Sequence, residues 1–392
     1  MTTGSTTKID SVIERLDSSA DTDQVFEALE DVLMHEKDFH RLFDAKLIRT
    51  RHQLGLPLSE PTSLDNIPSE HQSSFRDAYI DAARTVGQLL LENDQLTDAW
   101  TYFRTIGEPD PVREVIDRVS IPQDPDESFD EVMNVALYEG AHMVKGLEFL
   151  LKTHGTCNSV TTLSQLQQQM TFEERRQSAA LLVRQIYSDL QHSLRSDLES
   201  RDPAVDGSAS IRELMTGQEV LFAEGNYHID VSHLHSIVGF ARSLTPDDPE
   251  LELAIELSEY GNQLSESLQY PGNPPFDRYY EAHLHFLNAL AGRNAEDALE
   301  WFIGRMDAEA EDGGKRLVAF VILDLGQRTD QDAVALVRTA PVLANVQDPG
   351  GFSFTSLCVE QGRLDLLEET ARSRDDVIAW ATARFTALNS SS

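Results

Sequence analysis

The spacing of apolar residues constrains the fold of this chain more than any other feature. Apolar side chains recur every three or four positions, which places them on one face of an α-helix. Continuous runs of β-branched residues bounded by turns are almost absent, so a sizeable sheet is not expected. The sequence therefore predicts an all-α fold. The segments with the strongest helical spacing are 21–53, 69–92, 130–152, 171–199, 249–268 and 277–291.

Two helix starts can be read directly from the sequence. Thr171 and Glu174 have the spacing of a capping box, in which each side chain bonds the backbone N–H of the other residue. Asp110 precedes Pro111, and proline suits the first turn of a helix because its missing N–H is not needed there. We therefore expect helices to begin near these two positions.

A finer pattern lies between Ala83 and Pro111. Gly87 is followed in order by Ala99, Phe103 and Pro111, an arrangement of small, small, aromatic and proline residues. This order resembles one tetratricopeptide repeat, a helix–turn–helix unit of about 34 residues. A hairpin of this kind cannot bury its apolar face alone, so the resemblance implies a stack of similar hairpins.

The C-terminal third contains further segments that can be aligned with this turn. Four windows of the sequence superpose: 91–99, 290–298, 325–333 and 359–367. Each follows an apolar helix and ends at a position expected to be buried in the next helix. From Ala298 to Ala333 is 35 residues and from Ala333 to Leu367 is 34, close to the tetratricopeptide period. Gly, Asn and Asp near the window centres suit a tight turn.

The resemblance covers residues 80–113 and 276–388, and it implies an α-solenoid of antiparallel helical hairpins forming a right-handed, tetratricopeptide-like superhelix. A generic array of antiparallel helix pairs gives similar spacing by geometry alone, and this alternative stays open. The expected organisation is an N-terminal helical hairpin, the first tetratricopeptide-like helices, an irregular helical middle and the C-terminal tetratricopeptide-like helices, at 1–54, 69–125, 126–270 and 276–388.

The charge of the chain excludes some partners. It has 67 acidic and 32 basic residues, a formal net charge of −35, which repels nucleic-acid phosphates and anionic membranes. No run approaches the length of apolar sequence that a transmembrane helix requires. The two cysteines, Cys157 and Cys358, are too few for a disulfide framework and fit a reducing compartment. We therefore expect a cytoplasmic protein that binds neither nucleic acid nor membranes.

The irregular middle contains the densest group of side chains suited to chemistry. His228, Asp230, His233 and His235 fall within eight positions. If a helix begins near Asp230, imidazole and carboxylate groups converge at its start, and such groups bind zinc, manganese or iron. His142, together with Glu139 on the same expected helix, is a further candidate ligand. The sequence thus gives His142, His228, Asp230 and His233 as candidate metal ligands.

Other interpretations of the same residues are open. Asp230 or Ser232 is the type of residue that caps a helix, and the histidines are also suited to hydrogen bonds between helices. His228 beside Asp230 could instead act as a general base without metal. The spacing is not that of the H-E-x-x-H zinc signature. A further pair, His283 and His285, is expected to point to different faces of one helix.

The leading functional hypothesis follows from the resemblance. Tetratricopeptide proteins bind other proteins, so we expect a cytoplasmic scaffold that binds a peptide or partner protein on its concave face, with no cofactor. The alternative is a metal-dependent enzyme whose His/Asp site lies in the irregular middle, with zinc, manganese or iron as cofactor. A purely structural role within a larger complex is the third possibility. No catalytic residue can be named from the sequence.

Overall fold

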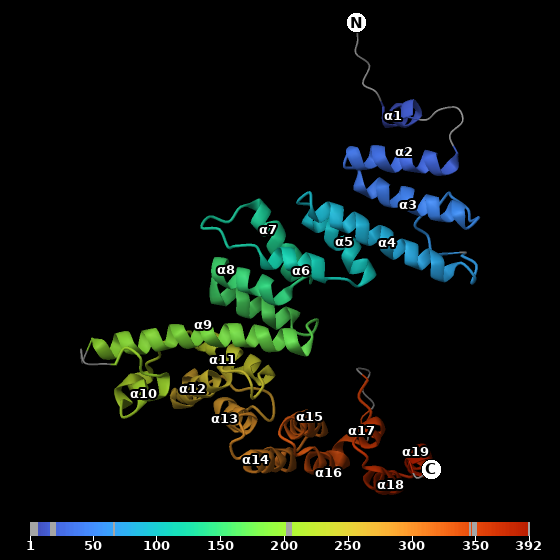
Figure 1. Ribbon diagram of the computed structural model, residues 1–392. Coiled ribbons are helices and arrows are strands. Elements are labelled where there is room, and N and C mark those ends of the chain that lie inside the picture. The colour runs from blue at the N-terminus through green and yellow to red at the C-terminus, as the bar shows by residue number, and fades with distance from the viewer. Residues whose placement is uncertain are drawn as a thin grey trace. The chain divides into compact units, whose positions relative to one another are not determined.

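The chain is built from helices alone in every part that the structure describes. The structure is a computed structural model that describes residues 7–15, 21–65, 67–200, 206–344, 346 and 351–390. All of the regular elements within these ranges are helices, and none is a strand (Figure 1). The expected all-α fold is therefore confirmed.

The chain divides into two compact units, Met1–Gly155 and Thr156–Ser392, here called unit 1 and unit 2. The division falls within helix α8 (Met143–Leu166), which Gly155 interrupts with φ 79° and ψ 179°. Glycine reaches positive φ at little cost because it has no Cβ. The boundary therefore lies inside residues 126–270, which the sequence analysis treated as one irregular middle.

Unit 1 consists of helices that pack on their neighbours in the sequence. Each helix from α1 to α5 contacts the next one, and α7 and η1 pack on α5. The elements are α1 (Lys8–Arg15), α2 (Thr22–His35), α3 (Phe39–Gln53), α4 (Gln72–Leu91), α5 (Leu96–Ile106), α6 (Asp110–Asp117), α7 (Glu127–Met133), the π-helix η1 (Asn134–Tyr138) and the first part of α8. Pro111 lies in the first turn of α6, as expected.

Gly87 allows α4 and α5 to approach closely. A Cβ on this glycine would lie 2.7 Å from Cε2 of Phe103, so no larger residue fits without movement. Phe103 and Ala99 are both fully buried. Two of the positions that carry the repeat resemblance, Gly87 and Phe103, therefore meet in the interface between these two helices, and a third, Ala99, is buried.

The expectation of one helix over residues 130–152 is wrong. The chain forms α7 and η1, leaves the helical path, and starts α8 at Met143. Gly140 turns the backbone with φ 80°, a conformation that few other residues adopt. Glu139 and His142 consequently flank a break and do not share the face of a continuous helix.

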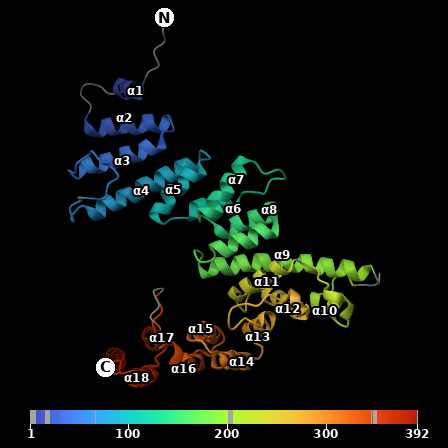
Figure 2. The same cartoon turned by 180° about the vertical axis from the view of Figure 1, so that it is seen from behind.

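After the second part of α8, unit 2 continues with the long helix α9 (Phe172–Glu199), which forms its first packing centre. Helices α10, α11 and α12 all pack against α9 (Figures 1 and 2). Thr171 and Glu174 start α9 with the expected capping box. Its buried face repeats at helical spacing through Leu182, Ile186, Leu190 and Leu194. Each Å² of apolar surface buried on this face contributes about 25 cal/mol, and this burial stabilises the packing of the surrounding helices on α9.

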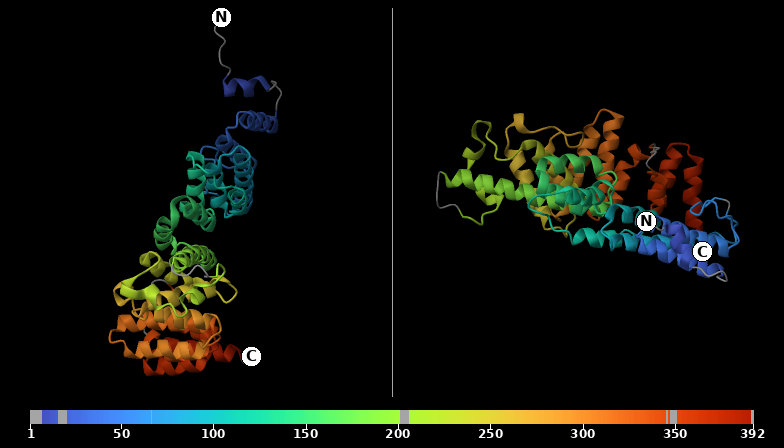
Figure 3. Two further views of the ribbon diagram at one scale, coloured as in Figure 1. Left: turned by 90° about the vertical axis from the view of Figure 1, so that its left-hand side faces the viewer. Right: turned by 90° about the horizontal axis from the view of Figure 1, so that it is seen from above.

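The remaining helices of unit 2 follow one another in packing order. Each helix from α12 to α19 contacts the next one, α13 also contacts α15, and the left-hand view of Figure 3 shows these helices, coloured yellow to red, packed side by side. The elements of unit 2 after α8 are α9 (Phe172–Glu199), α10 (Ile211–Met215), η2 (Glu219–Gly225), α11 (Val231–Phe240), η3 (Ala241–Ser243), α12 (Glu250–Gln263), η4 (Glu266–Leu268), α13 (Tyr279–Leu290), α14 (Ala295–Ala308), α15 (Asp312–Arg328), α16 (Asp332–Leu343), α17 (Phe354–Glu360), α18 (Leu364–Ser373) and α19 (Val377–Ser390).

The four sequence windows do span turns between helices. They join α4 to α5, α13 to α14, α15 to α16 and α17 to α18. Each contains a residue with left-handed backbone, and these residues are Asp94, Asn294, Asp330 and Gly362. Such residues close a helix by bringing the next N–H groups back to its last carbonyls. The expectation that Gly, Asn and Asp form the turn centres is confirmed.

For one of these turns, the predicted start of the buried face on the following helix is wrong. The windows end at buried residues in three helices, namely at Ala99, Ala298 and Leu367. Ala333 is exposed instead, and Val337, expected on the buried face, is also exposed. A Cβ on Gly326 would lie 2.4 Å from the Cβ of Ala335, so α15 and α16 meet at Ala335. The buried face of α16 therefore starts two residues later than expected.

Candidate functional site

The first candidate metal ligand, His142, lies in unit 1 and contacts polar groups of the same unit. Its Nε2 is 3.1 Å from Oδ1 of Asp117, and its backbone N–H donates to the carbonyl of Ala136. The neighbouring Glu139 carboxylate accepts a hydrogen bond from the amide of Asn134 at 3.2 Å. Both side chains therefore have polar partners within unit 1.

His228 lies in unit 2 and links three elements of the first packing centre. Its Nε2 is 3.2 Å from Oδ2 of Asp197 on α9, and its backbone N–H donates to the hydroxyl of Tyr260 on α12 at 2.8 Å. The His228 side chain is only 7 % exposed. This is the inter-helix hydrogen bonding that the sequence analysis left as an alternative to metal binding.

Asp230 caps α11. Its Oδ1 accepts hydrogen bonds from the backbone N–H groups of Ser232 and His233, at 2.9 and 3.2 Å. The Ser232 hydroxyl also donates to it, and this bond is the main reason that the pKa of Asp230 is lowered. The capping interpretation of Asp230 is therefore confirmed, and the carboxylate is held at the helix start by backbone donors.

The four candidate metal ligands belong to two different units. His142 belongs to unit 1, whereas His228, Asp230 and His233 belong to unit 2. No three His, Cys, Asp or Glu side chains in the described ranges are grouped in a way that would hold a metal ion. Metal binding stays a prediction, and each of His142, His228 and Asp230 has another role.

An apolar surface on the last helix is a candidate interaction site. We define the α19 stripe as Ile378, Ala381, Phe385 and Leu388, which lie three, seven and ten positions along one helix face. Ile378 is 74 % exposed and Phe385 is 65 % exposed. The opposite face of α19 packs on α18 through buried alanines. Large exposed apolar patches of this kind mark protein interaction sites.

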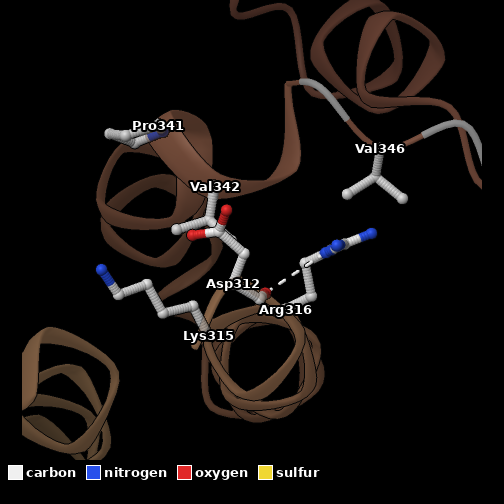
Figure 4. Close-up of a pocket in the computed structure, with 6 residues that line it drawn as sticks. All are labelled: Asp312, Lys315, Arg316, Pro341, Val342 and Val346. Atoms are coloured by element: carbon white, nitrogen blue, oxygen red, sulfur yellow. Dashed lines mark hydrogen bonds between the residues drawn. The ribbon is translucent and has the colours of Figure 1, made fainter. Parts of the chain in front are cut away.

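A polar pocket of about 390 Å³ lies between the start of α15 and the end of α16. Figure 4 shows the amino group of Lys315 and the guanidinium of Arg316 pointing in opposite directions. Arg316 donates through Nε to the carbonyl of Asp312 at 3.2 Å, and both residues are exposed. Because its charged groups remain in solvent, this pocket offers little energy for binding a ligand.

A second pocket, of about 360 Å³, contains buried polar groups. It lies among α11, η3, α13, α15 and the loop that follows η4. We call it the Arg242 pocket. Its polar and aromatic lining comes from His235, Arg242, Asn273, Phe276, Tyr279 and His283, and α15 adds aliphatic side chains.

Two of these pocket residues, His235 and His283, stand out in the sequence, but in separate groups. His235 belongs to the histidine group of the middle, and His283 to the separate pair with His285. As expected, that pair points to different faces, because His283 is buried and His285 stacks on Trp301 with ring centroids 4.6 Å apart. No pattern in the sequence singles out Arg242. The convergence of these residues depends on tertiary packing.

Comparisons with family models, curated proteins and solved structures find no match to this chain. The fold itself defines the class as an all-helical protein with no strand among the described elements. No helix that the structure describes has both the length and the apolar character needed to cross a membrane.

Proposed function

We propose that this chain is a helical-repeat interaction protein, a tetratricopeptide-like α-solenoid that binds a partner protein. The consecutive packing of α12 to α19 and the recurring left-handed turns support the repeat architecture. Stacked hairpins present extended surfaces, and protein recognition is their common use. The repeat family remains an analogy, since fold alone does not determine function.

The α19 stripe is the observation that carries the proposal. Ile378 and Phe385 lie on one helix face, and each leaves most of its surface in water. Covering a side chain of this size releases roughly 1.5–3 kcal/mol, so an apolar partner gains substantial free energy here. The spacing of the stripe is that of one side of a helix–helix interface. The partner we propose presents an amphipathic helix to α19.

The partner is a different protein and not a second copy. Each copy carries a formal charge of −35, and strong like charge opposes self-association. A partner helix with basic residues beside its apolar face would gain from the same charge. We place this interaction in the cytoplasm, because Cys157 and Cys358 are both free thiols.

Site-specific photo-crosslinking tests the proposal. A photoreactive amino acid replaces Phe385 in one version of the chain and Glu369, an exposed polar residue of α18, in the control. In native extract, position 385 should yield a defined crosslinked protein that position 369 does not. Phe385→Ser should prevent the same protein from co-purifying, without loss of helix content.

Two outcomes would count against the proposal. Equal crosslinking from positions 385 and 369 would show that α19 offers no specific surface. A crosslink between two copies of this chain would make the stripe a homodimer interface, contrary to the charge argument.

A further inference from the structure

The Arg242 pocket contains a cation without a carboxylate partner. The Arg242 guanidinium lies over the ring of Phe276, with Cζ 4.5 Å from the centroid, and Nε donates to the carbonyl of Gly239 at 3.3 Å. In the described part of the chain, no ion pair joins Arg242 to an acid, and Asp324 pairs with Arg328. Burial lowers the pKa of Arg242, although an arginine remains charged.

Two histidines beside this cation have ring nitrogens that lack a hydrogen-bond partner. His283 is 1 % exposed, and its Nδ1 donates to the carbonyl of Tyr279 at 2.7 Å. In a neutral ring this leaves Nε2 as an acceptor, and Nε2 has no partner. The Nδ1 of His235 is also buried without a partner. A buried polar atom left without a hydrogen bond destabilises the folded chain, so a bound molecule that contacts it is stabilised.

The pocket is held in shape before any ligand binds. The Tyr279 hydroxyl donates to the carbonyl of His235 at 2.6 Å, and the two rings stack with centroids 3.6 Å apart. Gly239 makes room for this hydroxyl, since a Cβ there would lie 2.6 Å from it. Phe276 and the aliphatic side chains of α15 supply apolar walls. A preformed pocket loses little entropy on binding.

We propose that the Arg242 pocket binds a small organic acid that carries a hydroxyl group near its carboxylate and an apolar body. The carboxylate pairs with the Arg242 guanidinium, and the hydroxyl donates to Nε2 of His283 once the side chains that cover this atom move aside. The apolar body lies against Phe276 and α15. A single guanidinium and a volume of about 360 Å³ suit one small carboxylate better than a polyphosphate. This binding site is independent of the proposed partner surface on α19.

Three matched compounds test the ligand chemistry on the full chain. 3-Phenyllactate has the carboxylate, the hydroxyl and the apolar ring; 3-phenylpropionate lacks the hydroxyl; and 3-phenyllactamide lacks the charge. Calorimetry or ligand-observed NMR should give the tightest binding for 3-phenyllactate. Loss of the hydroxyl should weaken binding about 3- to 10-fold, and loss of the charge about 10- to 100-fold.

Two variants assign these effects to residues. Arg242→Met should remove the preference for the acid over the amide, and His283→Phe should remove the preference for phenyllactate over phenylpropionate. Arg305→Met is the matched control, because Arg305 also lies over an aromatic ring, that of Trp301, but outside this pocket. It should bind all three compounds as the unchanged chain does.

The variants must be shown to fold, and circular dichroism and thermal melting provide that measurement. Absence of saturable binding by all three compounds would overturn the proposal. Equal affinity for acid and amide in the unchanged chain would overturn it too. If Arg242→Met does not fold, the compound series and His283→Phe still decide the question.

Discussion

His283 is a titratable side chain with almost no access to water. Burial is the largest cause that lowers its pKa well below 6.5, and the nearby charge of Arg242 acts in the same direction. The unfolded chain takes up a proton here below about pH 6.5, whereas the folded chain does not. Stability from this group is therefore present above pH 6.5 and is lost as the pH falls, by up to about 1.4 kcal/mol per unit.

We expect His283→Phe to reduce the pH dependence of stability between pH 6.5 and 5. Chemical denaturation at several pH values measures the free energy of unfolding of the variant and the unchanged chain. His235 has its pKa lowered by burial and titrates in the same sense, so a smaller slope should remain. Equal slopes for the two chains would mean that His283 is protonated in the folded state.

Individual residues also show which parts of the site the sequence can predict and which it cannot. Asp230 is predictable as a cap, because a cap is formed with N–H groups two and three residues away. His235 and His283 share a pocket only because α11 and α13 pack side by side. No local pattern in the sequence encodes that contact, and none singles out Arg242.

Glycines at helix interfaces provide a test at the scale of the element. Gly261 of α12 faces Tyr280 of α13, and a Cβ on it would lie 2.3 Å from the ring. Gly304 of α14 is also inside a helix, but a Cβ there would meet nothing within 4 Å. We expect Gly261→Ala to lower the free energy of unfolding by about 1–3 kcal/mol. Gly304→Ala should raise it by up to about 1 kcal/mol.

Denaturant unfolding of these two variants provides the measurement. Both glycines lie in unit 2, so each serves as the control for the other. If both substitutions stabilise the protein, α12 and α13 do not meet at Gly261 as the structure describes.

The accuracy of the sequence prediction also differs between elements. Turns were predictable, because Asp94, Asn294, Asp330 and Gly362 are of types that adopt left-handed backbone. The break between η1 and α8 was not, since the apolar spacing continues through it. The shift of α16 to Ala335 depends on its contact with Gly326, and the repeat period carries no information about that contact.

Three tyrosines, one buried and two half-buried, link the stability of the molecule to alkaline pH. Burial is the main cause that raises the pKa of each of Tyr102, Tyr187 and Tyr260 to about 12. The unfolded chain ionises near pH 10, so stability from these groups is present below pH 10 and is lost as the pH rises toward 12. We expect the last tyrosines to ionise together with a loss of helix content between pH 10 and 12. Ionisation of all nine tyrosines near pH 10 without loss of helix would contradict the raised pKa values of these three groups.

For the molecule as a whole, we propose that the chain acts by holding a partner on α19. Light scattering after size exclusion measures this, on tagged chain and Phe385→Ser purified from native cells. We predict that the unchanged chain elutes in a complex heavier than one chain and that Phe385→Ser elutes at the mass of one folded chain. The same mass for both proteins, whether free or in a complex, would contradict the account.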